Sequence, residues 1–216
     1  MNESGNPTVF AVSGPSGSGK TTLCGEALKR LAWLRASISH TTRPARPGEV
    51  NGRDYHFVDR GTFGEMIGRG EFLEWAEVHG HLYGSSKRNL EGLGAGQALL
   101  FEVDCRGARK IRQEVAGAAL IFVMAPSLRD LLRRIQKRGE MSRDELLTRF
   151  RTARQEIREI GAFDFLLIND VFADTLAQLQ AILTGQQHHR EALAPFWLER
   201  WEREVPVLFR EMGVPG

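Results

Sequence analysis

Residues 14–21 read Gly-Pro-Ser-Gly-Ser-Gly-Lys-Thr, which is the complete Walker A pattern G-x-x-x-x-G-K-[ST]. The apolar run 8–12 before it predicts a buried strand, and the run 22–34 after it is compatible with a helix. In that setting, successive backbone N–H groups and the positive end of the helix dipole face one phosphate chain. The stretch therefore predicts a loop that binds a nucleoside triphosphate, rather than a Gly/Ser-rich turn that matches by chance.

The polar groups of this loop have separate expected roles. Lys20 is expected to reach the β- and γ-phosphates, and the Thr21 hydroxyl is expected to face Mg²⁺. The strand-like run 99–104 ends in Asp104, which is expected near Mg²⁺ or, alternatively, at the cap of the following helix. Asn169, after the last predicted strand, is expected to border the adenine. The expected ATP-binding residues are Gly14, Ser16, Gly17, Ser18, Gly19, Lys20, Thr21, Thr22 and Asn169.

Length and composition restrict the classes of protein to consider. The 216 residues suffice for one domain, and 42% hydrophobic residues suffice for a sizeable core. A net charge of +2 gives no case for nucleic acid or a membrane surface as partner, and no apolar stretch approaches ~18 residues. Cys24 and Cys105 lack metal-ligand spacing and are expected to be reduced core thiols of a cytoplasmic protein. Met1 to Asn6 has no apolar segment of a signal peptide and is expected to be a frayed tail.

Apolar runs alternate with helical segments along most of the chain. Near-continuous apolar runs are typical of strands buried in a parallel sheet, so the alternation predicts an α/β fold with a parallel sheet flanked by helices. The strand candidates are Val9–Ser13, Ala98–Val103, Ala119–Met124 and Phe165–Ile168. The helix candidates are Lys20–Leu34, Gly107–Val115, Leu128–Lys137, Arg143–Ile160 and Phe172–Leu183, with Ser127 as a favourable cap for the third.

Two regions depart from this alternation. Residues 37–96 contain short alternating segments and predict a small mixed β insert with a helical stretch near Phe63–Ile67. In the segment after residue 184, Trp197 and Trp201 recur near helical spacing, which favours a helix that either packs on the domain or docks a partner. The expected organisation is a single domain with core 8–36 and 97–184, insert 37–96, a lid at about 138–149 and a C-terminal helical extension 185–216.

The insert also carries the groups of a second binding site. Arg43 and Arg46 flank Pro44 in a segment that proline keeps extended, and paired guanidinium groups suit capture of a phosphate. Glu74 lies on an alternating strand, and a carboxylate matches the adjacent N–H donors of guanine but not the acceptor that adenine presents. Further hydroxyl donors are available at Ser39, Tyr55, Tyr83 and Ser85.

These motifs, in their order, resemble the guanylate kinase family over roughly residues 8–183. The matching blocks are GPSGSGKTT, SISHTTRPARPGEVNGRDYHF, FLEWAEVHGHLYGSS, LLFEVD with RGA, RIQKRG and FDFLLIND. The resemblance implies a P-loop nucleoside monophosphate kinase in which Arg43, Arg46 and Tyr55 hold the GMP phosphate and Tyr83 assists. It implies that Ser39, Glu74, Ser85 and Glu102 lie at the guanine. Cys105 and Arg106 depart from the family pattern, without removing an implied catalytic group.

Phosphoryl transfer needs positive charge around the moving group. Arg134 and Arg138 share a face of a predicted helix, Arg149 follows on the next helix, and residues 139–142 between them resemble a hinge. The segment from Arg138 to about Arg149 is therefore interpreted as a lid. Spacing alone does not separate these arginines from Arg133 or Arg151; the resemblance implies Arg134, Arg138 and Arg149, together with Lys20, as catalytic.

The sequence thus predicts an enzyme that uses ATP and Mg²⁺ to phosphorylate GMP, and also dGMP, to the diphosphate. The expected partners are these small molecules, with neither nucleic acid nor membrane; the oligomeric state stays open. Two alternatives are kept. A ribose-bisphosphate kinase on the same scaffold would be expected to lack the guanine-reading residues. A non-catalytic binding module would be expected to have lost Lys20 or Thr21, which are both present.

Overall fold

The computed structural model describes residues 8–78, 80–137 and 143–185, together with the single positions 199, 203, 204, 207 and 210. The chain divides into two compact units, each described by itself below. The first comprises Met1–Ala11 and Leu31–Ala118, and the second comprises Val12–Arg30 and Ala119–Gly216. None of the helices in the described ranges combines the length and the apolar character needed to cross a bilayer.

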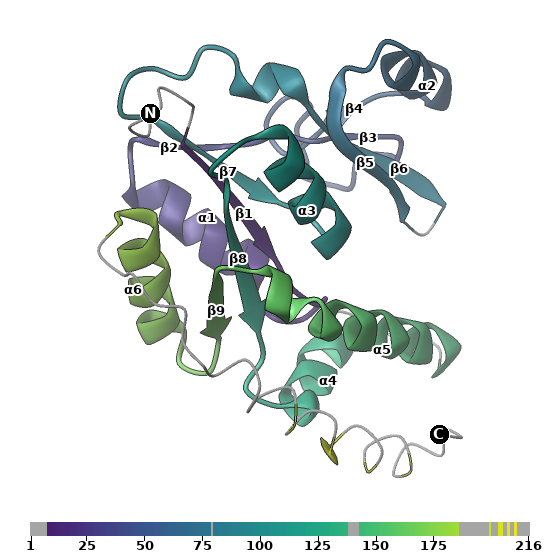
Figure 1. Ribbon diagram of the computed structural model, residues 1–216. Coiled ribbons are helices and arrows are strands. Elements are labelled where there is room, and N and C mark those ends of the chain that lie inside the picture. The colour runs from purple at the N-terminus through teal and green to yellow at the C-terminus, as the bar shows by residue number, and fades with distance from the viewer. Residues whose placement is uncertain are drawn as a thin grey trace. The chain divides into compact units, whose positions relative to one another are not determined.

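Strands and helices alternate over much of the chain, as the labels in Figure 1 show. The strands are β1 (Thr8–Ser13), β2 (Leu34–Ala36), β3 (His40–Thr41), β4 (His56–Phe57), β5 (Phe72–Val78), β6 (His81–Ser86), β7 (Ala98–Glu102), β8 (Ala119–Met124) and β9 (Phe165–Ile168). The helices are α1 (Lys20–Arg30), α2 (Arg60–Gly68), α3 (Cys105–Glu114), α4 (Leu128–Gln136), α5 (Arg143–Arg158) and α6 (Phe172–Leu183). Two 3₁₀ turns are η1 (Lys87–Leu90) and η2 (Ile160–Ala162). The alternation is interrupted where β2, β3 and β4, then β5 and β6, and then α4 and α5 follow one another directly.

The larger sheet has five strands in the order β2-β7-β1-β8-β9. β2 pairs in parallel with β7, and β8 pairs in parallel with β9. The predicted α/β fold with a parallel sheet is confirmed, and β8 and β9 have the predicted bounds. The expectation of a helix up to Leu34 was wrong: α1 ends at Arg30, and Leu34 begins a strand in register with Ala98. Pairing with β7 and the burial of Leu34 outweigh the helix propensity of this segment.

The smaller sheet has four strands in the order β4-β3-β6-β5 and confirms the predicted mixed β insert. β3 pairs in parallel with β4, whereas β6 pairs antiparallel with both β3 and β5. Its apolar face packs on Phe63 and Met66 of α2, with Phe72 stacked on the Phe63 ring at 4.5 Å. Asp59 begins α2 by accepting a hydrogen bond from Thr62 N, so this helix starts three residues before the predicted stretch.

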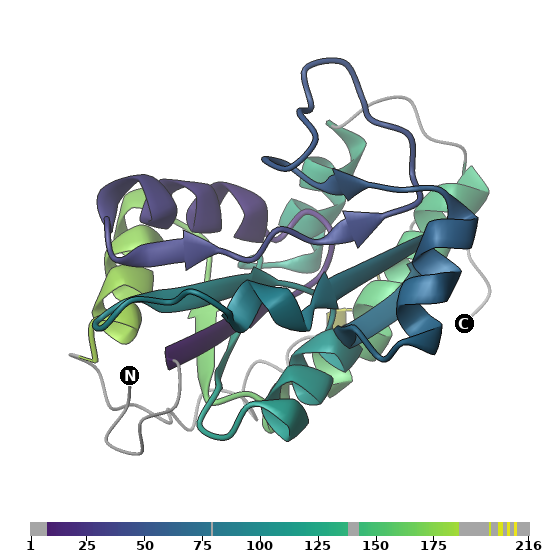
Figure 2. The same ribbon diagram turned by 90° about the horizontal axis from the view of Figure 1, so that it is seen from above.

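Apart from α1, the helices of the second unit, α4, α5 and α6, begin and end close to the predicted positions. α1 and α6 lie side by side, as Figures 1 and 2 both show. Ser127 caps α4 as predicted, accepting a hydrogen bond from Asp130 N at 3.0 Å. α5 ends at Arg158, two residues before the predicted end. The expected tail 1–6, hinge 139–142 and tryptophans 197 and 201 lie outside the described residues.

Candidate functional site

The Walker loop has a backbone that requires glycine at three positions. The φ angles of Gly14, Gly17 and Gly19 are 141°, 88° and 94°, in the region that L side chains rarely adopt. A Cβ atom at Gly14 would lie 2.0 Å from the Val123 carbonyl oxygen, and one at Gly19 would lie 2.1 Å from the Asn169 amide nitrogen. The neighbouring Val123 and Asn169 therefore leave no room for a side chain at Gly14 or Gly19.

Asn169, at the end of β9, holds this loop in place. Its side-chain amide donates a hydrogen bond to the Ser18 carbonyl at 2.8 Å, and its backbone N–H donates to the Met124 carbonyl at 2.7 Å. Asn169 is only 5% exposed and Ser18 is fully buried. In this structure the amide of Asn169 faces the phosphate-binding loop, which gives the residue a clear structural task besides the predicted one at the adenine.

Two of the three predicted transfer arginines lie in described parts of the chain. Arg134 of α4 donates a hydrogen bond to the Asn169 carbonyl at 2.8 Å. Arg149 of α5 donates to the hydroxyl of Ser16 in the Walker loop at 3.3 Å. Both guanidinium groups are thus anchored by neutral oxygens at or beside the loop. Arg138 lies outside the described residues.

The first turn of α1 carries the remaining predicted groups of this half of the site. Lys20 begins α1, and Thr21 and Thr22 follow it and are exposed. Mg²⁺ that binds together with substrate phosphates needs only one or two protein oxygens, which fits the Thr21 hydroxyl in the first turn of α1. No group of three His, Cys, Asp or Glu side chains gathers in the part of the chain that the structure describes. The donors therefore suit a metal that arrives with the nucleotide.

In the first unit, Arg43 is held in place by a carboxylate. Its guanidinium makes a two-pronged contact with Glu49, at 2.8 Å from Nη2 and 3.0 Å from Nη1, and Nη1 also donates to the Pro44 carbonyl at 2.7 Å. Glu49 also accepts a hydrogen bond from the backbone N–H of Arg46 at 2.7 Å, which ties both predicted phosphate arginines to one carboxylate. This pairing lowers the pKa of Glu49 and raises the pKa of Arg43.

Two tyrosines lie against the Arg43 guanidinium. The central carbon of that group lies 5.4 Å from the centre of the Tyr55 ring, within reach of a cation–π interaction. The rings of Tyr55 and Tyr83 meet edge to face at 6.0 Å. Burial and, secondarily, the charge of Glu102 raise the pKa of Tyr55, so its hydroxyl stays a donor at neutral pH. The residues expected at the phosphate of the acceptor nucleotide therefore all belong to this unit: Arg43, Arg46, Tyr55 and Tyr83.

Glu74 lies on β5 of the smaller sheet, and its carboxylate is buried. It is 7% exposed and pairs in register with Ser85, whose hydroxyl donates to Glu74 Oε1 at 2.5 Å. The hydroxyl of Ser39 lies 3.4 Å from that of Ser85. Burial is the main cause that raises the pKa of Glu74, and the hydrogen bond from Ser85 opposes it. Three of the four residues predicted at the guanine thus form one chain of contacts. The fourth, Glu102, is the exposed last residue of β7.

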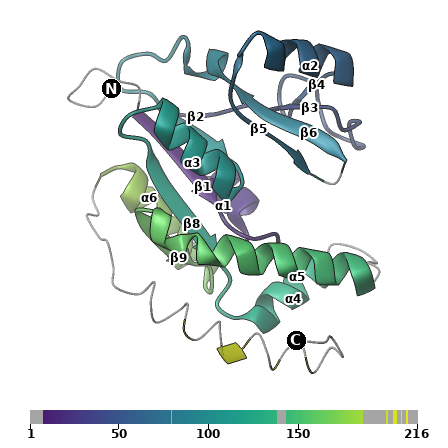
Figure 3. The same ribbon diagram turned by 45° about the vertical axis from the view of Figure 1, so that its right-hand side comes forward.

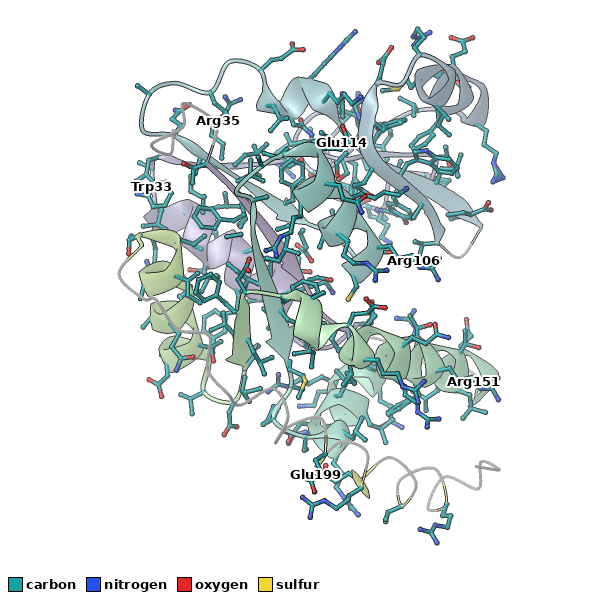
Figure 4. The ribbon with its side chains drawn as sticks, in the orientation of Figure 1. Trp33, Arg35, Arg106, Glu114, Arg151 and Glu199 are labelled. Atoms are coloured by element: carbon teal, nitrogen blue, oxygen red, sulfur yellow. The ribbon has the colours of Figure 1, made fainter. Side chains whose placement is uncertain are left out.

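The loop after β7 shows how Asp104 and its neighbours are used. Asp104 caps α3 by accepting a hydrogen bond from Gly107 N at 2.7 Å, which confirms the alternative interpretation and moves the helix start to Cys105, two residues before the predicted one. Cys105 is buried, whereas Arg106 is exposed in the first turn of α3, where Figure 4 labels it. The departure at 106 therefore places a charge on the surface, apart from the buried residues of α3.

Two positioning residues were absent from the predicted site. Glu49 lies in the quoted motif block, and a lone acid beside two arginines and the turn at Gly48 was a usable signal. Asn89 of η1 donates to the Ser37 hydroxyl at 2.8 Å and to the Ile38 carbonyl at 3.2 Å, which supports the segment leading to Ser39. Its contact spans more than fifty residues, so no local pattern could have revealed it.

Comparison with known proteins gives consistent results. A family model described as guanylate kinase matches residues 6–186. The chain is 41% identical over 193 residues to a guanylate kinase of Alkalilimnicola ehrlichii, covering 89% of this chain and 95% of the relative. It is 46% identical over 176 residues to a guanylate kinase of Dechloromonas aromatica, covering 81% and 87%. The crystal structure of guanylate kinase from Anaplasma phagocytophilum is similar, with a TM-score of 0.69, 32% identity and coverage of 86% of this chain and 88% of that chain.

Proposed function

The chain belongs to the guanylate kinase family, and from this premise we propose which of its residues carry out the family's reaction. The reaction is the ATP-dependent phosphorylation of GMP to GDP, an activity of a nucleoside monophosphate kinase. We extend it to dGMP, because the guanine and phosphate contacts proposed below leave the 2′ position of the sugar unread. ATP is assigned to the Walker loop with Gly14, Ser16 to Thr22 and Asn169, and GMP to the insert.

The observation that carries the choice of acceptor is the buried Glu74. A carboxylate accepts two hydrogen bonds side by side, which matches N1–H and the 2-amino group of guanine. Adenine presents an acceptor at N1, so the same carboxylate would meet a lone pair and a buried polar mismatch. Ser85 and Ser39 support Glu74 on one side. Glu102 is assigned to the same end of the nucleotide.

The 5′-phosphate of GMP is assigned to Arg43, Arg46 and Tyr55, with Tyr83 assisting. Arg43 presents a planar fork suited to two phosphate oxygens. The Tyr55 hydroxyl is protonated at neutral pH, and burial raises its pKa further. Arg46 is exposed and, apart from its backbone contact with Glu49, is free to turn toward an anion. The acceptor oxygen needs no dedicated base, because a phosphate oxygen is already a competent nucleophile at neutral pH.

On the donor side, catalysis is assigned to positive charge. Lys20, Arg134, Arg138 and Arg149 are proposed to surround the γ-phosphoryl group as charge spreads over its oxygens. Mg²⁺, held by the ATP phosphates and the Thr21 hydroxyl with Asp104 in support, would neutralise phosphate charge when bound. The segment 138–149 is proposed as a lid, within a single domain whose core is 8–36 and 97–184 and whose insert is 37–96. The cytoplasm is proposed as the site of the reaction, since Cys24 and Cys105 are reduced and form no disulfide.

The test is a coupled assay of ADP release with ATP, Mg²⁺ and each nucleoside monophosphate in turn. Rapid turnover with GMP and little with AMP, CMP or UMP is the expected result. Ribose 1,5-bisphosphate is included as acceptor for the alternative kinase on this scaffold, and the Lys20→Ala variant, which should no longer bind ATP, addresses the non-catalytic module. ATP binding without GMP turnover would contradict the proposed function.

A further inference from the structure

Gly107 lies directly against the carboxylate of Glu74. A Cβ atom placed on Gly107 would be 3.0 Å from Glu74 Oε2, 3.2 Å from Glu74 Cδ and 3.1 Å from Val103 Cβ. These separations are tighter than ordinary contacts, so a methyl group there would have to push its neighbours by a few tenths of an ångström. Figures 1 and 3 show α3, which carries Gly107, running beside β5, which carries Glu74.

The backbone conformation does not explain why this position is glycine. Gly107 lies in the first turn of α3 and is absent from the glycines with positive φ. Any residue could adopt its dihedral angles, and alanine would favour the helix. The space for a side chain at 107 is instead taken by the Glu74 carboxylate and by Val103.

The carboxylate is confined from two directions. On one side the Ser85 hydroxyl donates to Oε1 at 2.5 Å, and on the other Oε2 rests against Gly107. Gly107 is itself fixed, because its N–H donates to Asp104 Oδ1 at 2.7 Å in the cap of α3. The side chain of Glu74 is 7% exposed, so it has little room to choose another position.

We propose that Gly107 is a positioning residue that sets where the Glu74 carboxylate meets guanine. The proposal rests on the assignment of Glu74 as guanine reader. Two parallel hydrogen bonds to N1–H and the 2-amino group need both carboxylate oxygens in one plane with the base, and the geometry of such pairs is sensitive to displacement. Because hypoxanthine lacks the 2-amino group, IMP engages only one of the two oxygens. The preference for GMP over IMP therefore reports the position of the carboxylate.

The test compares Gly107→Ala with Gly64→Ala, since Gly64 lies inside α2 of the same unit and a Cβ there would meet nothing within 4 Å. Steady-state kinetics with GMP and IMP are measured for wild type and both variants, with the KM for ATP as internal control. Gly107→Ala is expected to lower the preference for GMP over IMP by about tenfold, through a weakened charge-assisted hydrogen bond. Its KM for ATP stays unchanged, and Gly64→Ala keeps the wild-type preference.

An unchanged ratio of kcat/KM for GMP and IMP in folded Gly107→Ala would overturn the proposal, whether activity with both nucleotides is retained or falls equally. If Gly107→Ala does not fold, the double variant Gly107→Ala/Glu74→Ala is compared with it by thermal denaturation. Recovery of cooperative unfolding in the double variant supports contact with the carboxylate, whereas no recovery assigns the conflict to Val103 and overturns it. Failure of wild-type protein to phosphorylate GMP would instead contradict the proposed function.

Discussion

Replacing Asn169 by alanine is expected to loosen the Walker loop and weaken ATP binding. The substitution removes the amide that donates to the Ser18 carbonyl at 2.8 Å. It leaves the backbone of residue 169 in place, so the hydrogen bond from Arg134 to its carbonyl remains possible. The effect should therefore fall on the loop and spare the anchoring of α4.

The magnitude follows from burial. Asn169 is 5% exposed and Ser18 is fully buried, so truncation leaves a carbonyl oxygen without its donor in a dry setting. Leaving such a group unsatisfied costs about 1–3 kcal/mol. For a protein of this size each kcal/mol lowers the unfolding midpoint by about 2–4 °C, which predicts a fall of roughly 4–8 °C for a central cost of about 2 kcal/mol.

A double-mutant cycle with Gly19→Ala makes the prediction more specific. A Cβ at Gly19 would lie 2.1 Å from the Asn169 amide nitrogen, in addition to the strain of a side chain at φ 94°. The Asn169→Ala background removes the colliding amide and leaves the strain, so Gly19→Ala should cost less there than in wild type. Residues in direct contact of this kind couple by about 0.5–3 kcal/mol.

Thermal denaturation and calorimetric titration with MgATP measure the two effects. Asn89→Ala serves as the matched control, because it also removes an amide donor to a backbone carbonyl, but in the insert. Both variants should lower the unfolding midpoint, whereas only Asn169→Ala should weaken ATP binding, by about tenfold. An unchanged ATP affinity in Asn169→Ala, or strict additivity with Gly19→Ala, would refute the reasoning.

Three further predictions concern the insert. Glu49→Gln should raise the KM for GMP by about tenfold and leave the KM for ATP unchanged, because one acceptor and the charge that orient Arg43 are lost; equal changes in both KM values would contradict it. Burial raises the pKa of Glu74, so the wild-type KM for GMP should rise as the pH falls through that raised pKa, where the carboxylate becomes protonated. Glu74→Gln should lose about a hundredfold in kcat/KM for GMP together with this pH dependence, and a retained acidic limb would argue against Glu74 as its source. Burial, with the charge of His56 second, lowers the pKa of His40 from 6.5 to about 4, so the unfolded chain binds a proton that the folded protein does not, and stability should fall between about pH 6.5 and 4. Urea denaturation at several pH values gives the free energy of unfolding as a function of pH. This free energy should change less steeply with pH in His40→Phe than in wild type, and an identical pH dependence would assign the loss to other groups.

The parts of the fold that could be predicted from sequence are those with local causes. The Walker loop, β8 and β9 follow from glycine spacing and continuous apolar runs, each complete within a few residues. β2 could not be predicted in this way, because Leu34 to Ala36 becomes a strand only through pairing with β7 more than sixty residues later. The role proposed for Gly107 could not be predicted from local sequence either, since this residue of α3 lies close to a carboxylate on β5.

The choice among arginines on α4 is an intermediate case. Leu128, Leu131 and Ile135 form the buried stripe of this helix. At about 100° per residue, Arg133 points almost opposite that stripe, whereas Arg134 lies at its flank. The structure agrees: Arg133 is exposed and pairs with Asp130 at 2.6 Å, and Arg134 reaches the Asn169 carbonyl. Phase relative to the buried stripe would have separated the two residues where spacing between arginines did not.

The arginines assigned to the two nucleotides are held by different kinds of acceptor, which has a consequence for their chemistry. Arg134 donates to the Asn169 carbonyl and Arg149 donates to the Ser16 hydroxyl, and neither of these two acceptors carries a formal charge. Arg43 is anchored by the carboxylate of Glu49, so the pair is close to neutral.

Glu49 and the Pro44 carbonyl engage three N–H groups of Arg43, and a guanidinium has five. The Tyr83 side chain also interacts with this guanidinium. The N–H groups that are not engaged by protein acceptors can bind phosphate oxygens. Under the proposed assignment, Arg134 and Arg149 would face the negative charge that develops during transfer, whereas the Arg43–Glu49 pair would orient the monophosphate. Glu49→Gln removes both a negative charge and an acceptor that orients Arg43. The predicted rise in the KM for GMP therefore requires that the loss of orientation outweighs the gain in positive charge.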